Sequence, residues 1–263
     1  MLVTLLTDFG TGDYFVGAMK GALLTVNPRA QIVDITHEIA PHDVEAGAFT
    51  LLAAFDTFPA GTVHVAIVDP GVGSSRRAVV VESERHTFVG PDNGVFGYVY
   101  ERAQALRVFH VTNEKYFRPR VSATFHGRDI FAPVAGALSL GIRPEEFGPE
   151  ITDFVRLPFA APQRRTDGTL VATVIHVDRF GNCVTNISPR DLDEESIRRG
   201  VRLLIGDREI RSFRRFFGEE GDIVGEPFAI WGSAGLLELA IFRDSAARVL
   251  GIGRGQKVEV KKQ

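Results

Sequence analysis

The first 28 residues decide the fold, and they read MLVTLLTDFGTGDYFVGAMKGALLTVNP. The apolar run at 2–6 is typical of a strand that is covered on both faces, and the polar turn 7–13 ends it. Residues 14–26 then have the apolar spacing of a helix, which Asn27 and Pro28 end. The chain therefore opens with a predicted strand, turn and helix, the repeating unit of an α/β sheet.

The same alternation continues as far as residue 157. Because strand and helix keep alternating, the sequence predicts an α/β N-terminal domain with a largely parallel sheet over residues 1–157. Its further strands are expected at 31–35, 63–68, 78–81 and 106–111, and its further helices at 44–55 and 130–140.

The composition changes after residue 157. Residues 158–168 contain two prolines, a glycine and several polar side chains, so they are expected to form a linker. The remainder, 169–263, is predicted to form a smaller antiparallel, β-barrel-like C-terminal domain. Its alternating runs lie at 169–177, 201–205, 229–231, 236–241 and 257–260.

Composition and charge exclude several classes of protein. With 263 residues, 44% hydrophobic and 24% charged, the chain is typical of a globular protein. A net charge of −3 argues against nucleic acid as a partner, and the basic cluster at 198–215 is interleaved with acids, as on a solvated surface. No apolar run reaches the ~18 residues of a membrane span, and no signal peptide is recognisable, so we expect a soluble, cytoplasmic protein without a membrane partner. The single cysteine, Cys183, excludes an internal disulfide and a Cys-based zinc site.

The first candidate motif is TDFGTGD at 7–13, directly after the first strand, where an α/β fold places ligands. The carboxylates of Asp8 and Asp13 are suited to bind a diol and an ammonium group. The alternative is a plain turn in which Asp13 caps the following helix. The third glycine of a dinucleotide fingerprint is missing and no Walker lysine motif occurs, so phosphate binding is disfavoured.

The second motif is VDPGVGSSRR at 68–77. Its proline and glycines predict a tight loop that leaves Asp69 at the strand tip, with Arg76 able to fold back towards it. The alternative is a hairpin-like turn with a surface ion pair, which contributes little.

The third and fourth motifs are TFHGRD at 124–129 and DRFGNCVTN at 178–186. His126 precedes a helix and could act as an acid, a base or an orienting group; the alternative is a structural histidine. The acid, aromatic and amide groups of the fourth motif could bind an amino acid and a stacked base; the alternative is an ordinary β-turn. The segment HEIAPH at 37–42 does not have zinc-protease spacing, and Pro41 would disrupt the helix which that site needs.

These four motifs, in this order, resemble the S-adenosyl-L-methionine hydroxide adenosyltransferases. They are the hydrolytic members of the superfamily that also contains the fluorinase and chlorinase, and the resemblance extends from residue 7 to about residue 247. It implies an N-terminal α/β domain, a C-terminal β-barrel-like domain and a homotrimer whose active sites lie between one subunit's N-terminal domain and a neighbour's C-terminal domain. It also implies attack at C5′ of the small-molecule substrate S-adenosyl-L-methionine, releasing L-methionine and, in the hydrolytic branch, adenosine. The reaction requires no metal and no cofactor.

The resemblance also implies roles for individual residues. The catalytic set of the family matches Asp69, Arg76 and His126. The substrate-binding positions match Asp8 for the ribose, Asp13 and Asp178 for methionine, Phe180 and Asn182 for adenosine, Ser233 near the methionine carboxylate, and Glu238 in a Leu-Glu segment.

The branch of the superfamily follows from Asp69 and from the pair His126 and Gly127. The halogenating relatives have a tyrosine in place of Asp69 and a halide-contacting serine in place of Gly127, so the resemblance favours the hydrolytic branch. Phe15 and Ala234 depart from a serine and an arginine that serve methionine recognition in the halogenating branch. We expect Asp69, held by its two partners, to orient or deprotonate a water molecule in line with C5′ and sulfur. The alternatives are a halogenase of the same superfamily and a non-catalytic module that binds adenosine or S-adenosyl-L-methionine.

Overall fold

The computed structural model describes residues 1–103, 105–157, 161–219 and 225–262. The chain divides into two compact units, Met1–Phe159 and Ala160–Gln263, and each is described by itself. Of the predicted linker 158–168, residues 158–160 lie outside the described residues. Strand β7 (Gln163–Arg164) falls within the same stretch and pairs antiparallel with β8 (Leu170–Val177).

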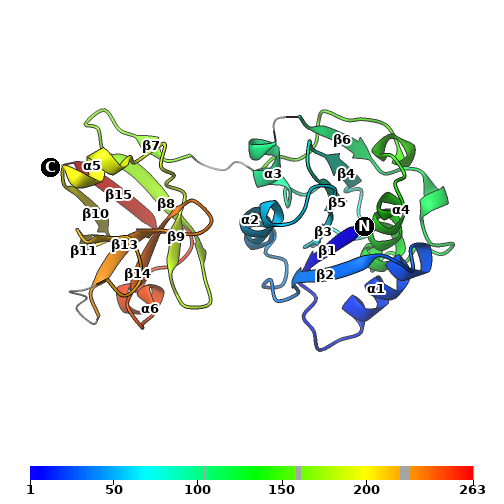
Figure 1. Ribbon diagram of the computed structural model, residues 1–263, viewed down its shortest axis with the longest axis horizontal. Coiled ribbons are helices and arrows are strands. Elements are labelled where there is room, and N and C mark those ends of the chain that lie inside the picture. The colour runs from blue at the N-terminus through cyan, green and yellow to red at the C-terminus, as the bar shows by residue number, and fades with distance from the viewer. Residues whose placement is uncertain (104, 158–160, 220–224, 263) are drawn as a thin grey trace. The chain divides into compact units, whose positions relative to one another are not determined.

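The first unit is built on a six-stranded sheet in the order β2-β1-β3-β5-β4-β6 (Figure 1). Strands β2, β1, β3 and β5 pair in parallel, whereas β4 runs antiparallel to both β5 and β6. The predicted largely parallel sheet is therefore confirmed, with one reversal that follows from the tight turn at Ser83, too short for a parallel crossover. The strands are β1 (Leu2–Thr7), β2 (Gln31–Thr36), β3 (Val63–Ile67), β4 (Ala78–Glu82), β5 (Thr87–Pro91) and β6 (Arg107–His110).

Helices cover both faces of this sheet (Figure 1). Helices α1 (Phe15–Val26) and α4 (Ala132–Ser139) pack together on one face, and α2 (Val44–Ala54) and α3 (Gly97–Arg102) on the other. The helix predicted at 130–140 differs at its start, because a π-helical turn, Gly127–Phe131, precedes α4. Strand β5 and helix α3 were not predicted. Short 3₁₀ turns lie at Phe55–Thr57, Glu114–Tyr116 and Pro144–Phe147.

The second unit is a nine-stranded, curled sheet whose path runs β11-β10-β15-β8-β9-β14-β13-β12, with β7 on β8. All its described pairings are antiparallel except that of β12 with β13, so the predicted barrel-like β architecture is confirmed. Leu203, Leu239 and Val258 are fully buried in its core. Its other elements are β9 (Cys183–Thr185), α5 (Glu194–Arg198), β10 (Val201–Ile205), β11 (Arg208–Ile210), β12 (Phe213–Arg214), β13 (Pro227–Trp231), β14 (Leu237–Ile241), α6 (Ala246–Leu250) and β15 (Lys257–Lys262).

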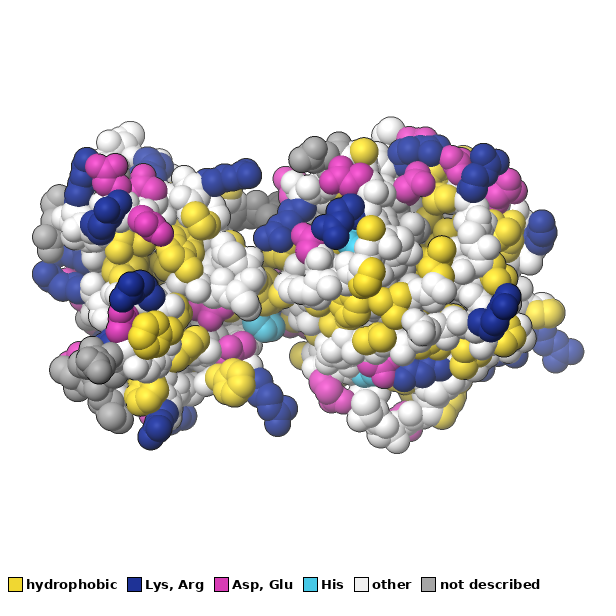
Figure 2. Space-filling view, in the orientation of Figure 1, with side chains coloured by type: hydrophobic (Ala, Val, Ile, Leu, Met, Phe, Trp, Pro, Cys, Tyr) yellow, Lys and Arg dark blue, Asp and Glu magenta, His cyan; other side chains and the backbone are white. Residues whose placement is uncertain are grey.

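The surface carries mixed charges. Basic and acidic side chains are interspersed over both units in Figure 2. Arginines of the basic cluster at 198–215 pair with glutamates: Arg199 with Glu195, Arg202 and Arg211 with Glu209, and Arg215 with Glu219. None of the described helices is long and apolar enough to cross a membrane.

Candidate active site

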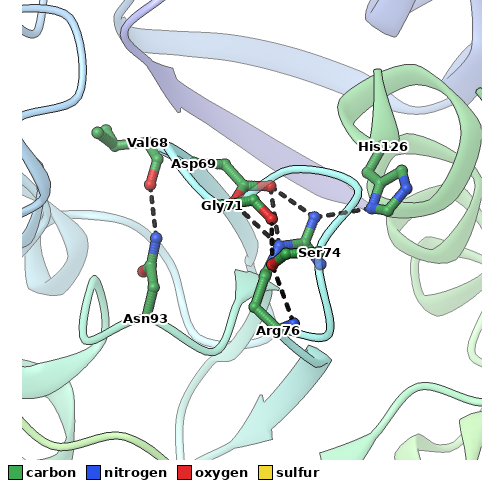
Figure 3. A network of polar contacts seen from close by, with 7 residues as sticks. All are labelled: Val68, Asp69, Gly71, Ser74, Arg76, Asn93 and His126. Carbon is green, nitrogen blue, oxygen red and sulfur yellow. Dashed lines mark hydrogen bonds and ion pairs between the residues drawn. The ribbon is translucent and has the colours of Figure 1, made fainter. Parts of the chain in front are cut away.

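The loop that follows β3 brings an aspartate and an arginine together (Figure 3). Arg76 folds back onto Asp69: its Nε donates to Oδ1 at 2.9 Å and to Oδ2 at 3.0 Å, and its Nη2 donates to Oδ2 at 2.5 Å. The side chains are 5% and 10% exposed, so the alternative of a surface ion pair does not hold. A nearly buried, doubly hydrogen-bonded pair fixes the orientation of the carboxylate.

His126 joins this pair from a distant loop. Arg76 Nη2 lies 2.8 Å from His126 Nδ1. Because a guanidinium can only donate, Nδ1 accepts this bond and the proton of a neutral ring is on Nε2. Burial, followed by the charge of Arg76, lowers the pKa of His126, against the opposing effect of the carboxylates of Asp69 and Asp129. The histidine therefore stays neutral near pH 7, and Nε2–H is its remaining hydrogen-bonding group.

The approach of the two loops depends on a glycine. Gly73 has φ +77, and a Cβ there would lie 2.2 Å from the carbonyl oxygen of Ala123, so the loop after β3 packs directly on the chain that leads to His126. Within the loop, Ser74 Oγ donates to the Gly71 carbonyl at 2.6 Å and accepts the Arg76 N–H at 3.2 Å (Figure 3). The loop is therefore held in one conformation by its own hydrogen bonds.

A pocket of about 310 Å³ connects this cluster to the end of β1. Its polar lining residues include Asp69 and His126 together with Asp8 and His42. Three rings, Phe9, Phe15 and Phe125, complete its apolar wall, with Phe15 edge-on to Phe125 at 5.1 Å between centroids. The volume and the combination of an apolar wall with a few polar groups are typical of a small-molecule site.

The two acids of the TDFGTGD motif separate in the structure. Asp8 is half-buried in the pocket, and its Oδ2 accepts the backbone N–H of His42 at 2.8 Å. Asp13 is exposed and does not line the pocket. It does not cap α1 either, since Tyr14 occupies the N-cap position without a side-chain hydrogen bond.

In the second unit, Asp178 organises the turn between β8 and β9. Its Oδ1 accepts the N–H groups of Phe180 at 2.9 Å and of Asn182 at 2.8 Å, and its Oδ2 accepts from Asn182 Nδ2 at 2.9 Å. The β-turn alternative is therefore correct for the backbone. The same turn leaves the ring of Phe180 78% exposed, available to stack on a ligand.

A second pocket, of about 500 Å³, lies beside this turn within the second unit. Phe180 and Asn182 line it together with residues that the sequence did not identify, among them Phe217 and Arg243. Arg243 has the left-handed backbone φ of +58, which is rare for a residue with a side chain and marks a constrained position. No sequence pattern signals that conformation. The remaining lining residues are Ile241, Asp244 and Ser245.

Ser233 lies in the turn between β13 and β14, Glu238 lies on β14, and neither residue lines this second pocket. Ser233 is exposed. Glu238 packs over Gly232, where a Cβ would lie 1.8 Å from its Oε1, and burial, followed by the charge of Asp178, raises the pKa of Glu238. Cys183 is buried, which raises the pKa of its thiol to about 11 and makes it unreactive at neutral pH. The described residues contain no group of three or more His, Cys, Asp or Glu that could hold a metal ion.

Family models match both units of the chain. A model described as the SAM hydroxide adenosyltransferase N-terminal domain matches residues 3–148, and one described as the corresponding C-terminal domain matches residues 172–259. The chain is 34% identical to a Methanocaldococcus jannaschii protein named (R)-S-adenosyl-L-methionine hydrolase, over 98% of this chain and 95% of that protein. It is 38% identical to a protein of the same name from Thermus thermophilus, over 98% of each.

A more distant relative and a solved structure also match over nearly the whole chain. A protein named fluorinase from Nocardia brasiliensis is 28% identical over 99% of this chain and 96% of that protein. The crystal structure of an uncharacterized conserved protein from Thermotoga maritima superposes with a TM-score of 0.89 at 34% identity, covering 100% of both chains.

Proposed function

The chain belongs to the SAM hydroxide adenosyltransferase family, and from this premise we propose that it hydrolyses S-adenosyl-L-methionine to adenosine and L-methionine. The observation that carries the proposal is the buried cluster of Asp69, Arg76 and His126 beside a pocket of about 310 Å³. A carboxylate held rigidly in a small pocket is suited to fix a water molecule against a bound substrate.

The difficult part of this reaction is the activation of the nucleophile, not the departure of the leaving group. The sulfonium leaves as a neutral thioether and needs no acid, whereas bulk water, with a pKa of about 15.7, is a weak nucleophile. In the proposed step a water oxygen forms a bond to C5′, the bond from C5′ to sulfur breaks with its electron pair going to sulfur, and one proton of the water passes to the Asp69 carboxylate. The enzyme's task is to hold that water in line with the breaking bond, at about 3 to 3.5 Å from C5′.

The hydrogen bonds around Asp69 leave a place for this water. A carboxylate has about four acceptor sites. Two N–H groups of Arg76 use these sites: the single Nε–H is shared between Oδ1 and Oδ2, and Nη2–H bonds to Oδ2, so Oδ1 retains a lone pair for a proton of the water. His126 Nε2–H can donate to the water oxygen and orient it, since Nδ1 is occupied by Arg76. Arg76 stabilises the negative charge that develops as the proton is lost.

Two features support hydrolysis over halogenation. Asp69 places a carboxylate in the pocket, which repels a halide ion. Position 127 is a buried glycine, and a Cβ there would lie 3.1 Å from Met19 Sδ and 3.2 Å from the ring of Phe125. The site therefore offers no hydroxyl at residue 127 to a halide, and a serine would require its neighbours to move.

The substrate contacts are part of the proposal. We assign Asp8 to the ribose hydroxyls, and Phe180 and Asn182 to the adenosine. Phe15 stacks on Tyr14 with 4.5 Å between ring centroids and contributes an apolar wall instead of a hydroxyl. The remaining candidates for the methionine portion are Asp13, Asp178, Ser233 and Glu238, with Ala234 in place of an arginine.

We propose a homotrimer in the cytoplasm, in which C-terminal residues of a neighbouring subunit complete each site. The family resemblance supports this assembly, since Phe180 and Asn182 serve the same ligand as Asp69 in that family. The proposed partner is the small-molecule substrate, with no cofactor, no metal, no nucleic acid and no membrane.

A product assay tests the proposed function. The purified protein is incubated with S-adenosyl-L-methionine, with and without chloride, and the products are separated by chromatography. We expect adenosine and L-methionine in equal amounts, with no dependence on chloride. A chlorinated nucleoside would instead identify a halogenase, and measurable binding without any product would identify a non-catalytic module.

A further inference from the structure

The segment 37–42, HEIAPH, is attached to the loop that carries Asp8. The segment follows β2 and fits no metal-binding pattern, yet it lies beside the residues that end β1. Its contacts involve both side chains and backbone, so the loop cannot shift without breaking several of them together. The four hydrogen bonds are Gly10 N–H to the His37 carbonyl at 2.7 Å, Thr7 Oγ1 with His37 Nδ1 at 2.8 Å, His42 N–H to Asp8 Oδ2 at 2.8 Å, and Thr11 Oγ1 to Glu38 Oε1 at 3.2 Å.

The buried member of this set is the pair Thr7 and His37, which are 0% and 4% exposed. His37 Nε2 lies 3.1 Å from Asp34 Oδ1. Burial opposes the charge of Asp34, but the bond from Lys20, at 2.6 Å, and the nearby His37 ring prevail and lower its pKa, so Asp34 is ionised. The nearby carboxylate can only accept, so its charge favours the tautomer with the proton on Nε2, and in that neutral tautomer Nδ1 accepts the hydroxyl proton of Thr7.

The Thr7 oxygen connects this histidine to the backbone beside Asp8. It accepts the N–H of Phe9 at 3.2 Å, so one hydroxyl links residues on both sides of Asp8 to His37. A second contact reaches the Asp8 side chain itself. His42 has a backbone φ of +70, and its N–H donates to Asp8 Oδ2. Oδ1 of Asp8 is thereby left to a ligand in the pocket.

We propose that the Thr7–His37 pair positions Asp8 to bind the ribose hydroxyls of the substrate. The inference rests on the proposed function, because it assigns Asp8 to the ribose. His37 does not line the pocket, so it acts through the loop as a positioning residue and not as a catalytic one. Without the pair, Asp8 loses its fixed orientation, and the ribose hydroxyls contribute less to the affinity for the nucleoside.

The chain contains a matched control for this pair. Thr4, also on β1 and also 0% exposed, has its Oγ1 2.8 Å from Nδ1 of the buried His64. The substitutions Thr7→Val and Thr4→Val therefore remove the same hydroxyl from the same kind of bond on the same strand. Only the first bond adjoins Asp8, so a general loss of stability affects both variants, whereas a loss of ribose recognition affects one.

The measurement is the dissociation constant of adenosine and of 2′,3′-dideoxyadenosine, determined calorimetrically for each variant. We expect the wild type and T4V to prefer adenosine by the same ratio, and T7V to lose about tenfold of that preference, the value of one hydrogen bond to a charged group. An unchanged ratio in T7V, with a wild type that discriminates, would overturn the positioning role and leave the proposed function standing. A wild type that binds both nucleosides equally would refute the ribose contact of Asp8, and one that binds neither would count against the proposed function itself.

Two substitutions of His37 provide a second route if T7V does not fold. In His37→Asn the side-chain amide occupies the position of Nδ1 and retains the bond to Thr7. In His37→Gln the longer side chain places the amide at the position of Nε2 and retains the contact with Asp34. We expect H37N to keep the adenosine preference and H37Q to lose it. Equal losses in both variants would show that His37 only fills space, which contradicts the proposal.

Discussion

Replacement of Asp69 by asparagine is expected to lower kcat for adenosine formation by a factor on the order of 10³, the usual scale for removal of a positioned proton acceptor. An amide retains the size of the carboxylate but cannot take a proton, and one of its two heteroatoms becomes a donor that faces the donors of Arg76. The variant also leaves the guanidinium, only 10% exposed, without its counter-ion, so the folded protein loses stability as well. The comparison of kcat must therefore be made at a temperature at which circular dichroism shows the variant to be folded.

The neighbouring residue provides the control for this substitution. Arg77 Nε donates to Asp92 Oδ2 at 2.9 Å, and the Asp92 side chain is 2% exposed, so a second Asp–Arg pair with a buried carboxylate lies next to the first. Neither residue lines the pocket of about 310 Å³. Asp92→Asn should lower the melting temperature while retaining kcat within a factor of about three below it. Equal losses of kcat in D69N and D92N would show that the effect of Asp69 is structural.

Replacement of Arg76 by lysine is expected to lower kcat by a factor on the order of 10², although the positive charge is kept. The guanidinium contacts both oxygens of Asp69 and, at 2.8 Å, Nδ1 of His126 from one rigid plane. A lysine ammonium is a point charge on a flexible chain and cannot hold both partners in that geometry. Steady-state kinetics check this, and Arg77→Lys is the control that leaves the cluster intact. Wild-type turnover in R76K would mean that charge alone is required.

Regular strands and helices of the first unit follow from local patterns. The apolar runs at 2–6 and 63–68 are strands covered on both faces, and this pattern is visible in the sequence. The run at 31–35 is also a strand, but β2 lies at the edge of the sheet and its residues are exposed or only partly buried. Strand β5 and helix α3 are not visible, since residues 87–91 include a glycine and a proline and the helix has six residues. The π-helical turn before α4 is also hidden, because its residues are compatible with an ordinary helix.

The sequence predicts the individual residues of the site better than the contacts between its distant loops. The proline and glycines of the loop after β3 place Asp69 at a strand tip and turn Arg76 back towards it. The meeting of Arg76 with His126, 50 residues further on, depends on the close packing of Gly73 against Ala123, which local pattern does not encode. The contact of His37 with Thr7 is equally hidden, because these two residues become neighbours only when β1 and β2 pair.

The separation of Asp8 from Asp13 shows the limit of motif spacing. Both acids lie in one seven-residue motif, but only Asp8 lines the pocket, because the turn ahead of α1 leaves Asp13 exposed. A short motif specifies which residues are close in the chain. It does not specify which side chains face the same cavity.

The origin of the new oxygen atom tests the central claim, that water attacks C5′ of the substrate. The protein is incubated with S-adenosyl-L-methionine in water enriched in ¹⁸O, and the products are analysed by mass spectrometry. We predict adenosine with one ¹⁸O atom in its 5′-hydroxyl and unlabelled L-methionine, in equal amounts. Release of adenine, adenosine without the label, or the label in methionine would contradict this mechanism.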